Sequence, residues 1–172
     1  MKKVIIIGCP GSGKSTFARE LHRITDLPLH HLDMMYWNAD KTKVDKAVFL
    51  ESLENALNTD EWIIDGNYGS TMEMRMKACD TVIFLDLPTE MCISGILERR
   101  GKPRSDIPWY EPADSIDEEF LTFVRSYNEN SRPRVMELLS RYSDKEMIVL
   151  KSRAEADGFL SAQRANHIDN AR

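Results

Sequence analysis

Short apolar runs rich in β-branched residues recur along the chain, and polar or turn-forming residues end each of them. Runs of this kind are typical of strands that are buried on both faces, as in a parallel sheet. The pattern predicts strands over residues 3–7, 27–33, 61–66, 81–88 and 146–150. The run at residues 81–88, TVIFLDLP, is the most apolar of them, which favours a central place in the sheet.

Apolar residues at helical spacing fill the segments between these runs. The spacing predicts helices over residues 14–24, 44–57, 70–78, 89–100 and 116–127, and two more that begin near residues 131 and 153. Strands that alternate with helices, without internal repeats, predict an α/β domain with right-handed crossovers. A length of 172 residues fits one such domain, so we expect residues 1–172 to fold as a single unit.

Composition and charge narrow the class of protein. The formal net charge of −5 gives no general attraction to a polyanion, so nucleic acid is not an expected partner. The apolar run at residues 4–7 is far shorter than a secretory or membrane-spanning segment, so we expect a cytoplasmic protein without a membrane partner. Cys9, Cys79 and Cys92 lack metal-ligand spacing and are predicted to be small buried thiols.

A phosphate-binding motif follows the first predicted strand. Residues 8–15 read GCPGSGKS and match G-x-x-x-x-G-K-[ST] between a strand and a helix, where its backbone N–H groups cradle phosphates. Lys14 is predicted to reach the β- and γ-phosphates and Ser15 to bind Mg²⁺. The predicted nucleotide-binding residues are Gly8, Gly11, Ser12, Gly13, Lys14, Ser15 and Thr16. ATP with Mg²⁺ is the expected cofactor, and no N-K-x-D guanine signature is present.

Two acids that follow apolar strands compete for the role of supporting the metal ion. Asp65 lies in WIIDG, where Gly66 permits close approach of the chain to a ligand. Asp86 lies in IFLD before Leu-Pro-Thr, a context typical of a turn or of a helix cap, and Thr89 is a second candidate for that cap. Asp65 is the favoured metal residue, together with Ser15.

The motifs GCPGSGKST, HLDMMYW, WIIDGNY and DTVIFLDLP, followed by ERR, occur in this order. With them the chain resembles the adenylate-kinase-like P-loop nucleoside and nucleotide kinases. It resembles more closely the bacterial DNA topology modulation proteins, over roughly residues 1–150. The resemblance implies a P-loop NTPase fold of three α/β/α layers, with a five-stranded parallel sheet in the order 2-3-1-4-5. It also implies an acceptor region after the second strand and a short helical, arginine-bearing lid over about residues 101–131.

The resemblance also implies roles for single residues. In those kinases the third strand leads into DGFPR, whose arginine holds the acceptor's phosphate, whereas residues 65–69 here read DGNYG. Arg75 in the next helix is the candidate for that charge, and Asn67 and Tyr68 complete the predicted acceptor site. Asp33 corresponds in position to acids that contact an acceptor hydroxyl. It is predicted either to accept the proton of that hydroxyl or to cap the turn MMYW.

Seven arginines lie between residues 99 and 141. Phosphoryl transfer needs cations that neutralise charge on the transferring group, so Arg99, Arg132 and Arg134 are predicted to be catalytic, with Lys14 and Asp33. The alternative is solvated surface charge. Residues 101–114 carry three prolines and no period, which predicts a loop, and they lack a zinc-ligand pattern. Trp109 and Tyr110 either close over a ring or anchor this loop.

These observations favour a Mg-ATP-dependent kinase that transfers the γ-phosphoryl group to a small-molecule acceptor. The acceptor is a nucleoside, a nucleotide or a related metabolite. Two alternatives stay open: a DNA-binding regulator switched by nucleotide, and a simple ATPase that uses water as the acceptor. The sequence is compatible with a monomer and with a homodimer.

Overall fold

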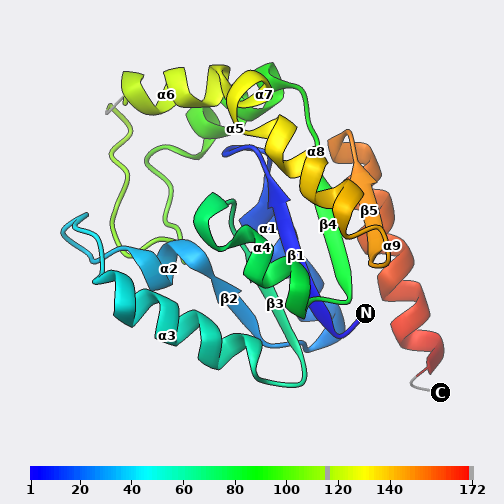
Figure 1. Ribbon diagram of the computed structural model, residues 1–172. Coiled ribbons are helices and arrows are strands. Elements are labelled where there is room, and N and C mark those ends of the chain that lie inside the picture. Colours follow the sequence, from blue (N-terminus) through cyan, green and yellow to red (C-terminus); the bar gives the residue numbers. More distant parts are fainter. Residues whose placement is uncertain (115–116, 171–172) are drawn as a thin grey trace.

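The computed structural model describes residues 1–114 and 117–170. Its centre is one parallel sheet in the order β2-β3-β1-β4-β5 (Figure 1). The strands are β1 (Lys3–Gly8), β2 (Leu29–His31), β3 (Trp62–Asp65), β4 (Thr81–Leu85) and β5 (Glu146–Leu150). The predicted α/β class and the predicted strand order are therefore confirmed.

Helices cover both faces of this sheet. They are α1 (Lys14–Thr25), α2 (Leu32–Tyr36), α3 (Lys46–Leu57), α4 (Gly69–Ala78), α5 (Thr89–Arg99), α6 (Glu118–Arg125), α7 (Tyr127–Asn130), α8 (Arg132–Arg141) and α9 (Arg153–Asn170). Alternate residues of β1 face opposite sides because side chains of a strand alternate. Val4 and Ile6 pack with α1, α5, α6 and α9, whereas Ile5 and Ile7 pack with α3, α4 and α8.

The parallel pairing sets where functional groups gather. The carboxyl ends of parallel strands meet at one edge of a sheet, and ligands bind outside that edge in open α/β folds. The loop after β1, Asp65 at the end of β3 and His31 at the end of β2 all lie there. His31 is directly opposite Asp65 in the register of β2 and β3. The sheet thus brings residues from three distant segments to one edge.

Three local predictions from the sequence need correction. The strand predicted over residues 27–33 ends at His31, because the fully buried Leu32 begins α2 and carries Asp33 into its first turn. The helix predicted over residues 116–127 divides at Ser126 into α6 and α7, and its predicted first residue, Ile116, lies outside the described residues. Pro88 is the cap residue of α5, so the predicted capping by Thr89 is wrong.

The cysteines behave as small apolar residues, as predicted. Cys9, Cys79 and Cys92 are buried and unpaired by disulfide. Burial of a thiol disfavours the thiolate, and it raises the pKa of Cys79 to about 11. Among residues 1–114 and 117–170 we find no helix whose length and apolar character suffice to cross a membrane.

Candidate active site

The loop between β1 and α1 has a backbone that requires glycine at two positions. Gly11 has φ +83°, and a Cβ there would come within 2.0 Å of the carbonyl oxygen of Cys92. Gly13 has φ +94° and caps α1 in the left-handed region. A side chain at Gly11 would clash with Cys92, and one at Gly13 would strain the backbone. The two glycines therefore allow the loop its tight turn before the first residue of α1.

Ser12 gives a test of whether this loop fits phosphate. Its side chain is buried, and its Oγ atom has no hydrogen-bond partner in the described part of the chain. A buried hydroxyl without a partner is costly, and a ligand oxygen is the natural partner in a loop at a helix N-terminus. The residues present therefore fit a bound phosphate.

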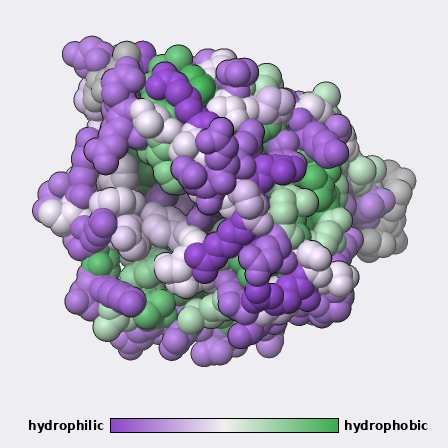
Figure 2. Space-filling model, turned by 45° about the horizontal axis from the view of Figure 1, so that its top comes forward, coloured by the Kyte–Doolittle hydropathy of each residue, from purple (hydrophilic) through white to green (hydrophobic). Residues whose placement is uncertain are grey.

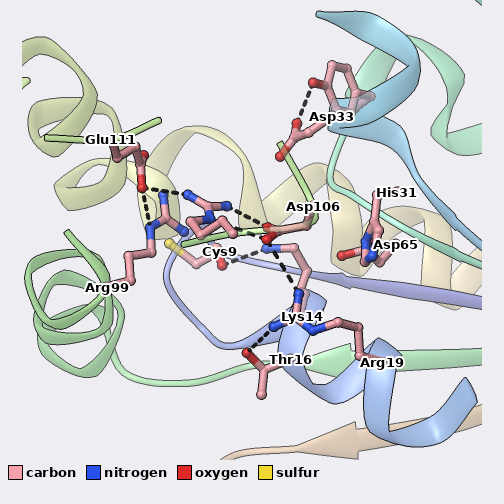
Figure 3. Close-up of polar contacts among 12 residues, drawn as sticks. Cys9, Lys14, Thr16, Arg19, His31, Asp33, Asp65, Arg99, Asp106 and Glu111 are labelled. Atoms are coloured by element: carbon pink, nitrogen blue, oxygen red, sulfur yellow. Dashed lines mark hydrogen bonds and ion pairs between the residues drawn. The ribbon is translucent and has the colours of Figure 1, made fainter. Parts of the chain in front are cut away.

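Lys14 lies at the centre of the site (Figure 3). Its Nζ atom donates to the carbonyl oxygen of Cys9 at 2.9 Å. Burial lowers the pKa of Lys14, while the nearby carboxylates of Asp65 and Asp33 act in the opposite direction. The ammonium group therefore faces two acids and holds only a neutral carbonyl, which leaves it suited to bind an anion.

A cavity of about 860 Å³ lies beside this loop. That volume is within the range of pockets that enclose a small ligand. Eleven of the predicted site residues line it: Gly11, Ser12, Gly13, Lys14, Ser15, Thr16, Asp33, Asp65, Asn67, Tyr68 and Arg99. Hydrophilic side chains cover most of the face shown in Figure 2, and paler side chains of intermediate hydropathy surround the hollow at its left.

Asp65 lines this cavity and pairs with His31 behind it. Nδ1 of His31 lies 2.6 Å from Oδ1 of Asp65, and Asp65 is 3% exposed. Such a partner fixes the orientation of a carboxylate and leaves its second oxygen for a ligand. Asp86 differs, because both its oxygens accept from Arg132 at 2.8 Å and it does not line the cavity in the described structure.

Asp33 and Tyr68 form a second pair on the same side of the cavity. The hydroxyl of Tyr68 donates to Oδ1 of Asp33 at 2.5 Å. Burial raises the pKa of Asp33 and the charge of Asp65 adds to this, whereas the hydrogen bond from Tyr68 opposes it. The α2 helix carries Asp33 and the cap of α4 carries Tyr68, so two elements together position one carboxylate.

The segment after α5 folds back over the cavity. In Figure 1 it runs from α5 toward α2 and returns to α6. Nη2 of Arg104 lies 2.5 Å from Oδ2 of Asp106, and Nη1 of the same arginine lies 2.6 Å from Glu111. Nε of Arg99 lies 3.4 Å from Glu111, and Nη1 of Arg19 lies 3.4 Å from Asp106. These ion pairs join the segment to α1 and α5 (Figure 3).

Asp106 is the residue of this network that reaches the phosphate loop. It is 4% exposed, and it lines the cavity together with Ser15. Burial favours the neutral acid, yet the hydrogen bonds and charge of Arg104, with help from Ser15 and Arg19, hold the pKa of Asp106 well below its usual range. Asp106 and Arg104 could not be found from the sequence, because a loop without periodicity carries no signal of which side chains turn inward. Arg19 on α1 could not be found either, because its partner Asp106 is distant in the sequence.

Some predicted site residues lie away from the cavity. Arg75 is fully buried and donates at 2.9 Å to the carbonyl oxygens of Gly66 and Tyr68, so it supports the loop after β3 from below. Arg132 is held by Asp86, and Arg134 is exposed on α8. None of these three arginines lines the cavity in the described part of the chain. Gly8 donates its N–H to Oδ1 of Asn67 at 3.4 Å.

The two lid aromatic residues differ in their surroundings. The ring of Trp109 packs edge-on against Trp37, with centroids 5.9 Å apart. Tyr110 is 61% exposed, and it does not line the cavity in residues 1–114 and 117–170. Trp109 therefore anchors the lid segment on the end of α2, as the second of the two predicted roles requires.

Sheet order, phosphate loop and enclosed cavity together define a P-loop nucleotide-binding protein with the α/β fold of P-loop kinases. A family model described as an AAA domain matches residues 4–137. The match covers more than half of the chain, and the chain belongs to that family. No curated protein matches the sequence.

Two solved structures share this fold. The deoxyadenosine kinase of M. mycoides with bound dATP is 21% identical, with a TM-score of 0.52, over 94% of this chain and 98% of that one. The shikimate kinase of Acinetobacter baumannii in complex with shikimate is 13% identical, with a TM-score of 0.61, over 99% of this chain and 94% of that one. At these identities the likeness establishes the fold.

Proposed function

We propose that the protein is a Mg-ATP-dependent kinase that transfers the γ-phosphoryl group to a small-molecule acceptor, a nucleoside, nucleotide or related metabolite. One observation carries the proposal. A single cavity joins a phosphate loop and Lys14 to a half-buried carboxylate, Asp33, with Arg99 at the end of α5 on its opposite side. Phosphoryl transfer requires these three functions in one enclosed place: a phosphate cradle, a base and a cation. The two kinases that share the fold support the same reaction class.

The nucleotide end consists of the loop after β1. Its N–H groups, the hydroxyl of Ser12 and the ammonium of Lys14 bind the phosphates, and Thr16 lies beside them in the wall. Ser15 and Asp65 are the residues that would hold Mg²⁺. When bound, the ion neutralises charge on the β- and γ-phosphates. The His31 contact keeps the Asp65 carboxylate in place at this end.

The acceptor end consists of Asp33, Asn67 and Tyr68. Asp33 accepts the proton of the acceptor's hydroxyl as that oxygen forms a bond to the γ-phosphorus. The bond from that phosphorus to the β-bridging oxygen breaks, and ADP leaves with the electron pair. Arg99 reduces the charge on the group in transfer, after its contact with Glu111 has opened. Burial keeps water from competing with the acceptor.

The proposed domain organisation, location and oligomeric state rest on the sequence and on its resemblance to known kinases. We propose one kinase domain over residues 1–172 with a lid over about residues 101–131, in a cytoplasmic monomer or homodimer. The motifs that resemble those of the DNA topology modulation proteins support membership of that subgroup of the kinases. A net charge of −5 and a cavity closed by ion pairs support a small-molecule acceptor over duplex DNA.

The test is a coupled assay of ADP release over nucleosides, nucleotides and hydroxylated metabolites. Release is expected to be slow with ATP alone and to accelerate at least tenfold with the acceptor. Steady phosphate release that no compound accelerates would establish an ATPase instead. Tight, salt-sensitive binding to duplex DNA would favour the regulator.

A further inference from the structure

The acceptor end of the cavity is acidic. Asp33 and Asp65 line the same side of the cavity, and the charge of Asp65, which the proposed function assigns to Mg²⁺ at the nucleotide end, disfavours ionisation of the Asp33 carboxyl (Figure 3). Lys14 is the cation that faces both, and the proposed function assigns it to the nucleotide phosphates. A second phosphate at the acceptor end would meet the carboxylate of Asp33. Like charges brought together in a desolvated site repel strongly.

The side chain of Arg75 does not line the cavity in the described part of the chain. It is the cation nearest in sequence to Asn67 and Tyr68, but its guanidinium is fully buried and is held by two backbone carbonyl oxygens at 2.9 Å. Turning it into the cavity would leave the carbonyl oxygens of Gly66 and Tyr68 without this donor, at a high cost for buried groups. Arg75 is therefore a structural residue of the loop.

The lid cations that face Asp33 already have carboxylate partners of their own. Arg104 pairs with Asp106 and Glu111, and Arg99 pairs with Glu111. Arg19 on α1 also pairs with Asp106, so the network holds three arginines and two acids, and each of these arginines has a carboxylate partner. Lys102 of the same segment also lines the cavity. Lys41 and Lys43 lie outside it, each 6.0 Å from the ring centroid of Trp109 and Trp37 respectively, and neither lines the cavity in the described ranges.

Aromatic rings make up the rest of the acceptor end. Trp37 and Tyr68 both line the cavity. Trp37 follows Asp33 by one helical turn, and Tyr68 donates a hydrogen bond to Asp33. The ring of Tyr68 packs against those of Tyr36 and Phe49, with ring centroids 4.8 Å and 5.8 Å away respectively. Rings that are fixed in this way present flat, weakly polar faces, which suit a ring-bearing ligand more than a hydrated ion.

From this arrangement we infer that the acceptor is an unphosphorylated ring compound whose neutral hydroxyl is the group that receives the phosphoryl. The inference rests on the proposed kinase function and narrows its substrate class. The hydroxyl donates to the free oxygen of Asp33, and the ring lies against Trp37 and Tyr68. Monophosphates carry the same rings, but the negative charge of Asp33 disfavours them.

The experiment compares matched pairs of probes in the ADP-release assay with the full chain. Adenosine, guanosine, cytidine and thymidine are each measured against their own 5′-monophosphates. We expect at least one nucleoside to be used with a kcat/KM about 100-fold or more above that of its monophosphate. Equal or faster reaction of the monophosphate overturns the inference, and so does failure of every nucleoside while ATP still binds. Absence of both ATP binding and ADP release defeats the proposed kinase function itself.

Two variants separate charge from packing. Asp33→Asn slows both reactions, but it removes the repelling charge, so the preference for nucleoside over monophosphate falls about tenfold. Trp37→Ala raises KM for the nucleoside about 10- to 100-fold and leaves KM for ATP unchanged. Tyr110→Ala, which removes an exposed aromatic ring of the lid, is the matched control and changes neither KM. An unchanged preference in Asp33→Asn contradicts the role of charge.

Discussion

Arg19 and Asp106 meet across the mouth of the cavity, with Nη1 of the arginine 3.4 Å from Oδ1 of the acid, although they are 87 residues apart in the sequence. Arg19 also donates to the hydroxyl of Thr16 at 3.2 Å, within the first turn of α1. One guanidinium thus ties the helix of the phosphate loop to the lid. Phosphates that enter the loop come next to the same guanidinium.

Replacing Asp106 should destabilise the protein in the absence of nucleotide. Asp106→Asn leaves Arg104, whose side chain is 11% exposed, without its closest carboxylate, and breaking a buried pair in this way costs about 3 to 5 kcal/mol. The free energy of unfolding in urea measures the loss.

The control for this variant is Glu118→Gln. Glu118 and Arg125 lie 3.8 Å apart with both side chains more than half exposed. Loss of such a surface pair changes the free energy of unfolding by about 0.5 kcal/mol or less. Equal effects of the two variants would show that the pair of Arg104 and Asp106 contributes no more than a surface contact.

Lys14→Ala should abolish nucleotide binding and leave the fold intact. The lysine binds one backbone carbonyl oxygen, and burial lowers its pKa, so the folded protein gains little from its charge. Calorimetry with Mg-ATP is expected to show no heat, while the unfolding midpoint stays within a few degrees of that of the unchanged protein. Retained binding would mean that the loop does not hold the phosphates through Lys14.

The two candidate acids for the metal ion should respond differently to substitution. Asp65→Asn is expected to raise the Mg²⁺ concentration needed for half-maximal ADP release by about 10- to 100-fold, the range typical of altered metal sites. Asp86→Asn is expected to leave that concentration unchanged, because Asp86 faces Arg132 and lies outside the cavity wall. A titration of rate against Mg²⁺ for both variants checks this, and the reverse order would assign the metal to Asp86.

The contrast between these acids shows how far sequence reasoning extends. The motif at residues 8–15 and the five apolar runs predict the parallel sheet and the phosphate loop, because strand burial and loop geometry are local properties. The order of the strands followed only from the resemblance to the P-loop kinases. The favoured choice of Asp65 rested on Gly66, a local signal as well. The partners of Asp65, Asp86 and Asp106 are His31, Arg132 and Arg104, and of these only Arg104 is close in sequence.

The lid shows the opposite limit. Residues 101–114 have no period, and their charges read equally well as solvated surface. Asp106 turns inward because Arg19 and Ser15 of α1 stabilise its carboxylate. These are tertiary contacts, so the local sequence gives no sign of them. Arg75 was also misassigned from the sequence. Its position in a helix gives no sign that its guanidinium donates to backbone carbonyl oxygens instead of facing the cavity.

Asp33 should set the acidic limb of the pH–rate profile. Burial raises its pKa, so the carboxylate that accepts the acceptor's proton forms only at a pH above the ordinary value for an aspartic acid, about 4. At saturating Mg-ATP, kcat/KM for the acceptor is therefore expected to rise with pH through a value above 4 and then level off. Asp33→Asn lowers kcat by about 10²- to 10⁴-fold and removes this limb.

Tyr68→Phe gives the sharper form of this prediction. The tyrosine hydroxyl donates to Oδ1 of Asp33 and stabilises its charged form, so it lowers the pKa against the effect of burial. Removing that hydroxyl leaves burial opposed only by the charges of Lys14 and Arg104, and the limb is expected to move to higher pH while the plateau rate changes less. A structural role alone would lower the rate at every pH without moving the limb. A shift toward lower pH would mean that Tyr68 stabilises the neutral acid, and Asp33 could not then act as the base described here.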